Sequence, residues 1–180
     1  MKLIILDRDG VINEDSDAYI KSPDEFIPIP GSLEAIARLN HAGYLVMIAT
    51  NQSGIARGYF TMDTLNQIHD KLKRLLNAYG GRFDGIFFCP HSPEDNCHCR
   101  KPKPGLYEEI AHRLHTDLTA VPVVGDSLRD LQAAQTVGAI PVLVRTGKGE
   151  RTLANGEGLH GILVYADLAA YVDDLLEGKL

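Results

Sequence analysis

Apolar residues of this chain form short unbroken runs, and longer stretches between them carry apolar residues at every third or fourth position. The short runs are rich in β-branched residues and do not alternate with polar ones. This pattern is typical of strands that are covered on both faces, as in a parallel sheet. We therefore expect strands at residues 3–6, 44–49, 85–88, 121–124 and 140–144, and an edge strand at 161–165.

The stretches between these runs have the periodicity of amphipathic helices. One begins after Gly31 and Ser32 and another after Thr61, and each places its leucines and isoleucines on one face. Further helices fit residues 106–114, 128–137 and 167–176. Alternating strands and helices predict an α/β fold, with a Rossmann-like parallel sheet in three layers and one domain over residues 1–180. Ligands of such sheets lie beyond the carboxyl ends of the strands.

Charge and composition narrow the classes of function. The net charge of -6 disfavours binding to nucleic acid or to anionic lipid, and no apolar stretch approaches the length of a membrane span. We therefore expect a cytoplasmic monomer with neither a nucleic-acid nor a membrane partner. A phosphorylated ligand would need a local group of cations within this acidic chain.

The first predicted strand ends in Asp7 and Asp9, two carboxylates close enough to bind magnesium. Acidic residues are also common in turns after strands, so this pair alone admits both interpretations. The fourth predicted strand ends in Gly125 and Asp126, with Asp130 four residues further on. Each of these features is weak evidence alone, and their order along the chain is the informative observation.

Two further residues suit phosphate. Thr50 ends the second predicted strand, and its hydroxyl with the adjacent N–H of Asn51 could hold a phosphoryl oxygen, although a threonine there could equally cap a helix. Lys101 precedes the helix at 106–114 and could neutralise phosphate charge, although most lysines are solvated surface residues.

The sequence resembles the haloacid dehalogenase superfamily. The four motifs of that superfamily match, in the same order along the chain, Asp7-x-Asp9-Gly10, Thr50, Lys101 and Gly125-Asp126. Within it, the runs at residues 7–13, 50–58 and 99–102 resemble the branch of histidinol-phosphate and heptose-bisphosphate phosphatases. The resemblance spans most of the chain.

The resemblance implies a magnesium-dependent phosphatase. Asp7 would be the nucleophile and form an aspartyl-phosphate, and Asp9 would act first as acid and then as base, its pKa raised by the nearby carboxylate. Magnesium would be held by Asp7, the backbone carbonyl of Asp9, and Asp126. Thr50 and Lys101 would stabilise the phosphoryl oxygens. The candidate substrate-binding residues are Asn51, Gln52, Ser53, Arg57 and Arg100.

A second metal site is indicated between residues 89 and 99. Cys89, His91, Cys97 and Cys99 supply three thiolates and one imidazole, the ligand set of a closed tetrahedral zinc site. Three unrelated thiols are the alternative, and His98 is a rival ligand that should point away because it lies between two ligating cysteines. The zinc would be structural and would orient the two cations that follow Cys99.

No cap domain fits, because residues 13–30 suffice only for a loop and residues 54–100 are taken up by a helix, a strand and the zinc loop. The crevice should be open, with residues 15–26 and the zinc loop as walls. The resemblance favours removal of the C7 phosphate of a heptose bisphosphate, in the synthesis of ADP-heptose for lipopolysaccharide. Arg57, Arg100 and Lys103 are the candidates for binding the second phosphate. The alternatives are a histidinol-phosphate phosphatase and a zinc-dependent binding module without activity.

Overall fold

A computed structural model describes all 180 residues of the chain, and its six strands form one sheet. Every neighbouring pair is parallel, in the order β3-β2-β1-β4-β5-β6, so β1 and β4 lie at the centre. The carboxyl ends of all six strands therefore share one edge. The strands are β1 (Leu3–Leu6), β2 (Leu45–Asn51), β3 (Gly85–Cys89), β4 (Pro122–Gly125), β5 (Ile140–Val144) and β6 (Leu163–Tyr165).

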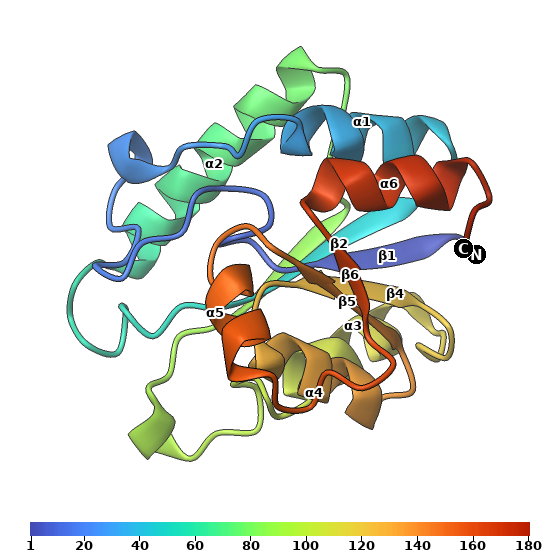
Figure 1. Cartoon of the computed structure of the whole chain (residues 1–180). Coiled ribbons are helices and arrows are strands. Elements are labelled where there is room, and N and C mark those ends of the chain that lie inside the picture. Colours follow the sequence, from blue (N-terminus) through green and yellow to red (C-terminus); the bar gives the residue numbers. More distant parts are fainter.

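Helices cover both faces of the sheet, which confirms the predicted three-layer α/β fold (Figure 1). One face carries α1 (Ser32–His41), α2 (Met62–Ala78) and α6 (Leu168–Leu176). The other carries α3 (Gly105–Leu114) and α4 (Leu128–Thr136). A short helix, α5 (Gly149–Asn155), lies instead near the carboxyl ends of the strands (Figure 1).

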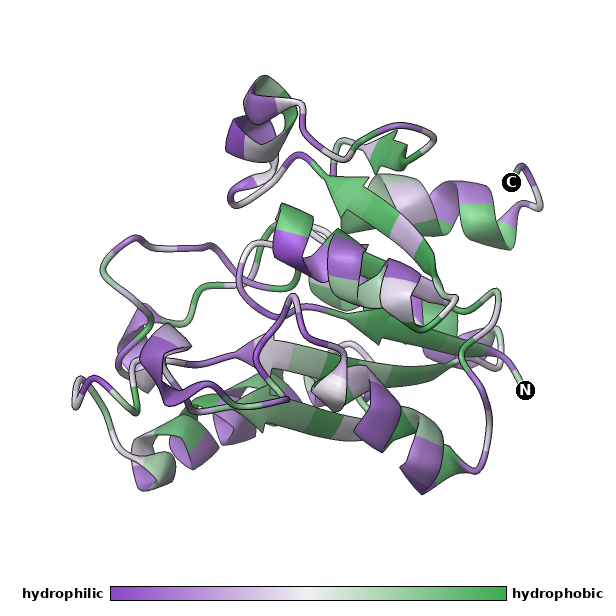
Figure 2. Cartoon of the chain, turned by 90° about the horizontal axis from the view of Figure 1, so that it is seen from below, coloured by the Kyte–Doolittle hydropathy of each residue, from purple (hydrophilic) through white to green (hydrophobic).

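Two hydrophobic layers explain the unbroken apolar runs. Ile4 and Leu6 of β1 pack in the layer under α1, α2 and α6, whereas Leu3 and Ile5 pack in the layer under α3. Successive side chains of a strand point to opposite faces, so a strand covered twice needs apolar residues at every position. Figure 2 shows the strands as mostly hydrophobic and the helices as mixed.

The ends of the predicted elements agree with the structure to within two residues, and two differences are informative. Strand β2 continues through Thr50 and Asn51, because these residues pair with Phe88 and Cys89 of β3. Helix α5 was not predicted. It has one buried residue, Gly149, and therefore lacks the apolar periodicity on which the prediction of helices depends.

The loops beyond the strands contain no inserted domain. Residues 14–31 form a loop with one 3-10 turn at Pro23–Glu25, and a similar turn at Pro93–Asp95 lies within the cysteine-containing loop. No helix combines the length and the apolar character that crossing a bilayer requires. The carboxyl edge of the sheet is thus left uncapped, as the sequence predicts.

A buried polar pair joins the end of β1 to α2. Arg8 has no exposed surface, and its Nη1 donates to Nε2 of His69, which is 7% exposed, over 3.1 Å. A guanidinium can only donate, so His69 must present an unprotonated nitrogen. Burial, together with the charge of Arg8, lowers the pKa of His69 to about 3. The imidazole is therefore neutral in the folded protein.

This pair predicts a loss of stability in mild acid. Below pH 6.5, the ordinary pKa of histidine, the unfolded chain binds a proton at residue 69 that the folded protein refuses until about pH 3. At pH 5 the resulting loss is about 2 kcal/mol. We expect His69→Gln, which still accepts from Arg8, to lose less stability than the wild type between pH 7 and pH 5 in urea unfolding.

The matched control is His160→Gln, because His160 is exposed. It should follow the wild-type pH dependence. Parallel stability curves for the wild type and His69→Gln would contradict a neutral buried His69.

Candidate active site

A polar cavity of about 450 Å³ opens at the carboxyl edge of the sheet. Residues from the ends of β1, β2 and β4 line it, together with residues of the surrounding loops. Apart from Lys103, every residue that the sequence assigns to magnesium, substrate or catalysis contributes to this lining: Asp7, Asp9, Thr50, Asn51, Gln52, Ser53, Arg57, Arg100, Lys101 and Asp126.

Three carboxylates meet at the base of the cavity. Asp7, Asp126 and Asp130 place oxygen atoms within 4.8 Å of one another. Asp130 is already engaged, since its Oδ1 accepts from Lys101 (2.6 Å) and its Oδ2 from the N–H groups of Asp126 and Ser127 (3.1 Å each). Asp7 and Asp126 are the members left to bind a cation.

The electrostatics of this cluster fit a magnesium ion. Burial, with the charge of Asp130, raises the pKa of Asp7 to about 7. Burial, with the charges of Asp7 and Asp130, raises the pKa of Asp126 well above its usual range. A divalent cation would relieve this repulsion, and an all-oxygen donor set is the kind that magnesium prefers.

Lys101 is a buried member of the same cluster, not a solvated surface residue. Its side chain is 2% exposed, and Nζ lies 2.6 Å from Asp130 Oδ1 and 3.2 Å from Asp7 Oδ1. It also donates to the carbonyl of Ala49 over 2.9 Å. Burial alone would lower the pKa of Lys101, but Asp130 and Asp7 raise it well above its usual range. An ammonium group thus stands beside the predicted nucleophile.

The side chain of Asn51 anchors Lys101. Its Nδ2 donates to the carbonyl of Lys101 (3.1 Å), and its Oδ1 accepts from the N–H of Lys101 (3.0 Å). The amide is therefore occupied by backbone, although Asn51 also lines the cavity. This pairing ties the end of β2 to the loop that carries the lysine.

Asp126 is held by a segment that the sequence analysis missed. The N–H of Lys148 donates to Asp126 Oδ2, and the hydroxyl of Thr152 donates to the Asp126 carbonyl, each over 2.8 Å. Gly10, with a φ of 88°, packs so closely that a Cβ there would lie 2.0 Å from Asp126 Oδ2. At Gly147, with a φ of 59°, a Cβ would lie 2.4 Å from the same oxygen. In the sequence, only the two closely spaced glycines, Gly147 and Gly149, could have indicated that this segment packs tightly against the site.

Asp9 lies in a different environment from the one predicted. Arg8 Nε and Asn13 Nδ2 both donate to its Oδ1 over 2.9 Å, and Gln52 Nε2 donates to its Oδ2 over 3.1 Å. Burial opposes ionisation, yet the charge of Arg8 and these hydrogen bonds hold the pKa of Asp9 below its usual value. The prediction of a raised pKa was wrong, because the adjacent arginine outweighs the neighbouring carboxylate.

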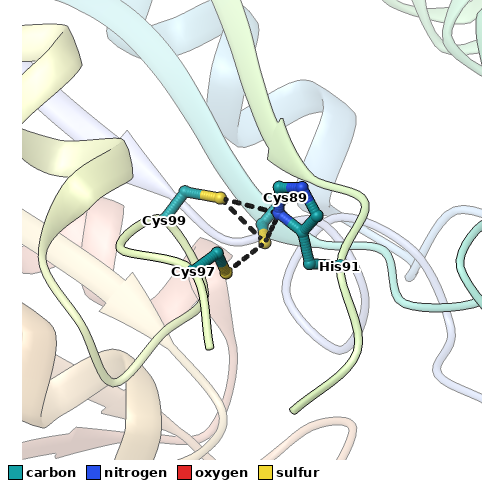
Figure 3. Close-up of side chains that lie close together, drawn as sticks. All are labelled: Cys89, His91, Cys97 and Cys99. Carbon is teal, nitrogen blue, oxygen red and sulfur yellow. Dashed lines mark hydrogen bonds between the residues drawn. The ribbon is translucent and has the colours of Figure 1, made fainter. Parts of the chain in front are cut away.

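The cysteine-containing loop brings four potential ligands together (Figure 3). The Sγ of Cys89 lies 3.6 Å from that of Cys97 and 3.0 Å from that of Cys99, and His91 Nδ1 lies 3.3 Å from Cys99 Sγ. Three thiols and one imidazole at this spacing are compatible with tetrahedral zinc. His98 is outside the group, 70% exposed and hydrogen-bonded to Glu108.

Ion pairs hold the loop that forms the opposite wall of the cavity. Lys148 Nζ contacts Asp15 Oδ2 over 2.8 Å, and Arg151 binds both carboxylate oxygens of Asp17 over 3.0 and 2.8 Å. Both aspartates and Lys148 line the cavity. The sequence analysis expected residues 15–26 to form a wall, and residues between 15 and 20 do line the cavity, whereas 21–26 do not. It did not identify α5 and the preceding Lys148 as the support of this loop.

The outer wall of the cavity carries three arginines. Arg57, Arg100 and Arg129 line it, and none forms an ion pair; Arg100 makes one long hydrogen bond, of 3.4 Å, to the carbonyl of His91. Burial, followed by the charge of Arg129, lowers the pKa of Arg100. Lys103 lies outside this cavity, where Nζ donates to the carbonyl of Cys97. Arg129 was missed because nothing in its sequence context marks a binding residue.

Comparison with known proteins identifies the family. A model described as HAD-hydrolase-like matches residues 98–171, and one described as polynucleotide kinase 3 phosphatase matches residues 2–134. A D-glycero-beta-D-manno-heptose-1,7-bisphosphate 7-phosphatase of Bordetella bronchiseptica is 60% identical over 98% of this chain and 99% of its own length. The protein of the same name from Pseudomonas putida is 55% identical over 98% of this chain and 100% of its own length.

A solved structure supports the same family assignment. The crystal structure of D,D-heptose 1,7-bisphosphate phosphatase from B. bronchiseptica, complexed with magnesium and phosphate, matches with a TM-score of 0.97 at 60% identity and covers 99% of both chains. The resemblance seen in the sequence motifs is thereby confirmed. This chain belongs to the haloacid dehalogenase superfamily and, within it, to the family of the D-glycero-beta-D-manno-heptose-1,7-bisphosphate 7-phosphatases, which are phosphoric monoester hydrolases.

Proposed function

We propose that this protein removes the C7 phosphate of D-glycero-D-manno-heptose 1,7-bisphosphate, with magnesium and through an aspartyl-phosphate on Asp7. The observation that carries the proposal is the buried cluster in which Asp7 meets Lys101 and Asp126 at the base of an open polar cavity. The names of the relatives that match over nearly the whole chain support the substrate.

Asp7 has one oxygen free for attack. Its Oδ1 accepts from the N–H of Arg8 (2.9 Å) and lies 3.2 Å from Lys101 Nζ, which leaves Oδ2 to bond to phosphorus. As that bond forms, the bond from phosphorus to the C7 oxygen breaks, and Asp9 protonates the leaving oxygen. Because Arg8 keeps Asp9 ionised in the free protein, Asp9 must first take up a proton from water or from the bound phosphate monoester. Asp9 then takes a proton from water, which attacks phosphorus, releases inorganic phosphate and restores Asp7.

Asp7, the backbone carbonyl of Asp9, and Asp126 would hold magnesium, whose charge offsets the repulsion between carboxylate and phosphate when it is bound. Lys101 and Thr50 stabilise the phosphoryl oxygens, on which negative charge is concentrated during transfer. Zinc bound by the four loop residues would have no open coordination position and would serve structure alone.

The three arginines of the outer wall favour a substrate with a second phosphate. Arg57 and Arg129 repel the guanidinium of Arg100, and none of the three arginines forms an ion pair, so a distal phosphate would neutralise positive charge at this wall. Histidinol phosphate would instead bring a protonated amine toward these cations, which is unfavourable. The arginines therefore favour the heptose bisphosphate over the alternative substrate.

Asp7→Asn tests the covalent step. An amide of nearly the same size cannot act as the nucleophile, so kcat should fall by at least about 10³-fold while the thermal unfolding temperature stays at or above that of the wild type. Phosphate release measured with saturating magnesium checks this. Turnover at a rate near that of the wild type would exclude an aspartyl-phosphate on Asp7.

Cys99→Ala tests the zinc site. Loss of one thiolate should release zinc and destabilise the loop that leads into Lys101, so the protein should lose stability by about 2–5 kcal/mol together with activity. Elemental analysis should find about one zinc per chain in the wild type and substantially less in the variant. Purified wild-type protein that contains no zinc would contradict the assignment.

Arg100→Ala and Arg129→Ala test recognition of the distal phosphate. Each should lower kcat/KM for the heptose bisphosphate by roughly 10- to 100-fold and for an aryl monophosphate by less than about threefold, because a monophosphate does not reach the outer wall. Phosphorus NMR should show that the anomeric phosphate stays on the product.

The control is Arg74→Ala, which removes an exposed arginine of α2 that lies outside the cavity. Its effect on both substrates should be small and equal. Faster turnover of histidinol phosphate than of the bisphosphate by the wild type would overturn the substrate assignment and leave the phosphatase assignment intact.

A further inference from the structure

We propose that Gln52 is a positioning residue that couples Asp9 to Thr50, so that one amide group orients both the proton-transferring oxygen and the hydroxyl that binds the phosphoryl group. The inference rests on the proposed phosphatase function, since it assigns Gln52 a part in that reaction. It differs from the role that the sequence suggested for Gln52, which was direct contact with substrate.

The geometry of Gln52 is that of a bridge. Its residue is 4% exposed, and Nε2 lies 3.1 Å from Asp9 Oδ2 and 3.0 Å from Thr50 Oγ1. An amide nitrogen carries two hydrogens, so it can donate to both oxygens at once. Because the carboxylate of Asp9, paired with Arg8, can only accept, the nitrogen of the amide must be the atom that faces it.

Gln52 contacts the only oxygen of Asp9 that is open for proton transfer. Oδ1 accepts from Arg8 Nε and Asn13 Nδ2 over 2.9 Å each, and Arg8 Nη2 lies 2.8 Å from the same atom. Oδ2 has Gln52 as its single donor. Proton exchange with the leaving oxygen and with water should therefore pass through Oδ2, whose direction Gln52 sets.

The same amide orients Thr50. Since Thr50 Oγ1 accepts from Gln52, its own hydrogen must point elsewhere, and its only other polar contact is a long one of 3.4 Å to the carbonyl of Asn51. The hydroxyl hydrogen is thus available to a phosphoryl oxygen. Thr50 is 1% exposed, so this arrangement is built into the protein before any substrate arrives.

The bridge is anchored from the zinc loop. The backbone N–H of Gln52 donates to the carbonyl of Cys89 over 2.8 Å, and Cys89 is both the last residue of β3 and a member of the four-ligand group. The position of Gln52 therefore depends on the end of β3. Because one buried amide contacts both Asp9 and Thr50, we infer that it serves catalysis more than stability.

The test is Gln52→Met, which keeps a similar length and removes both donors. Substrates are p-nitrophenyl phosphate, whose leaving group needs no proton, and the alkyl ester heptose 1,7-bisphosphate, whose C7 alkoxide does. We expect kcat to fall about 10-fold for the aryl ester through misorientation of Thr50, and about 100-fold or more for the alkyl ester through Asp9, with KM changed by less than about threefold. Gln67→Met, at an exposed position of α2, is the control and should leave both rates unchanged.

A double-mutant cycle with Asp9→Asn separates positioning from general damage. If Gln52 acts through Asp9, the extra loss on the alkyl ester should disappear in the Asp9→Asn background. Equal losses on both esters, or an extra loss that persists without Asp9, would overturn the proposal. Should Gln52→Met fail to fold, Gln52→Leu also removes both donors without adding a charge, and it must likewise slow the alkyl ester more than the aryl ester. If the wild type hydrolyses neither ester, the proposed function fails before Gln52 is judged.

Discussion

The buried ammonium group of Lys101 is the interaction on which the rest of the site depends. Three carboxylates lie within 4.8 Å of one another, and without a cation among them their repulsion would force protonation or separation. Lys101 contacts Asp130 and Asp7 directly, so Asp130 remains ionised and can accept the N–H groups that shape the turn after β4. Lys101 thus offsets part of the negative charge of the three carboxylates. Asp7 and Asp126 remain available to bind magnesium.

Placing a lysine at this depth requires support from outside the sheet. Asn51 binds the backbone of Lys101 on both its donor and its acceptor side, and the group of Cys89, His91, Cys97 and Cys99 lies on the segment that leads into it. The segment before α5 supports Asp126 in the same manner, through backbone N–H and hydroxyl groups. Each reacting group is therefore held by a loop that is itself fixed at two points, which is how an uncapped phosphatase can keep a preorganised site.

The charges of the site are arranged in two zones. At the base, carboxylates outnumber cations and favour a divalent metal; on the outer wall, Arg57, Arg100 and Arg129 form no ion pair. A substrate with a phosphate at each end would bridge the zones and complete the charge balance of both. Asp9 also lines the cavity and is held ionised by Arg8, and Asn13 and Gln52 bind its two oxygens.

The sequence by itself determined the order of strands and helices, the parallel sheet and the residues at its carboxyl edge. Unbroken apolar runs leave few alternatives to a doubly covered sheet, and strand ends of such a sheet must converge. Only the tertiary structure decided the ionisation of Asp9, the bridge made by Gln52 and the participation of Arg129 and of the segment at Lys148. A pKa and a hydrogen-bond partner depend on groups that come close only when distant parts of the chain fold together. A local sequence motif does not identify those groups.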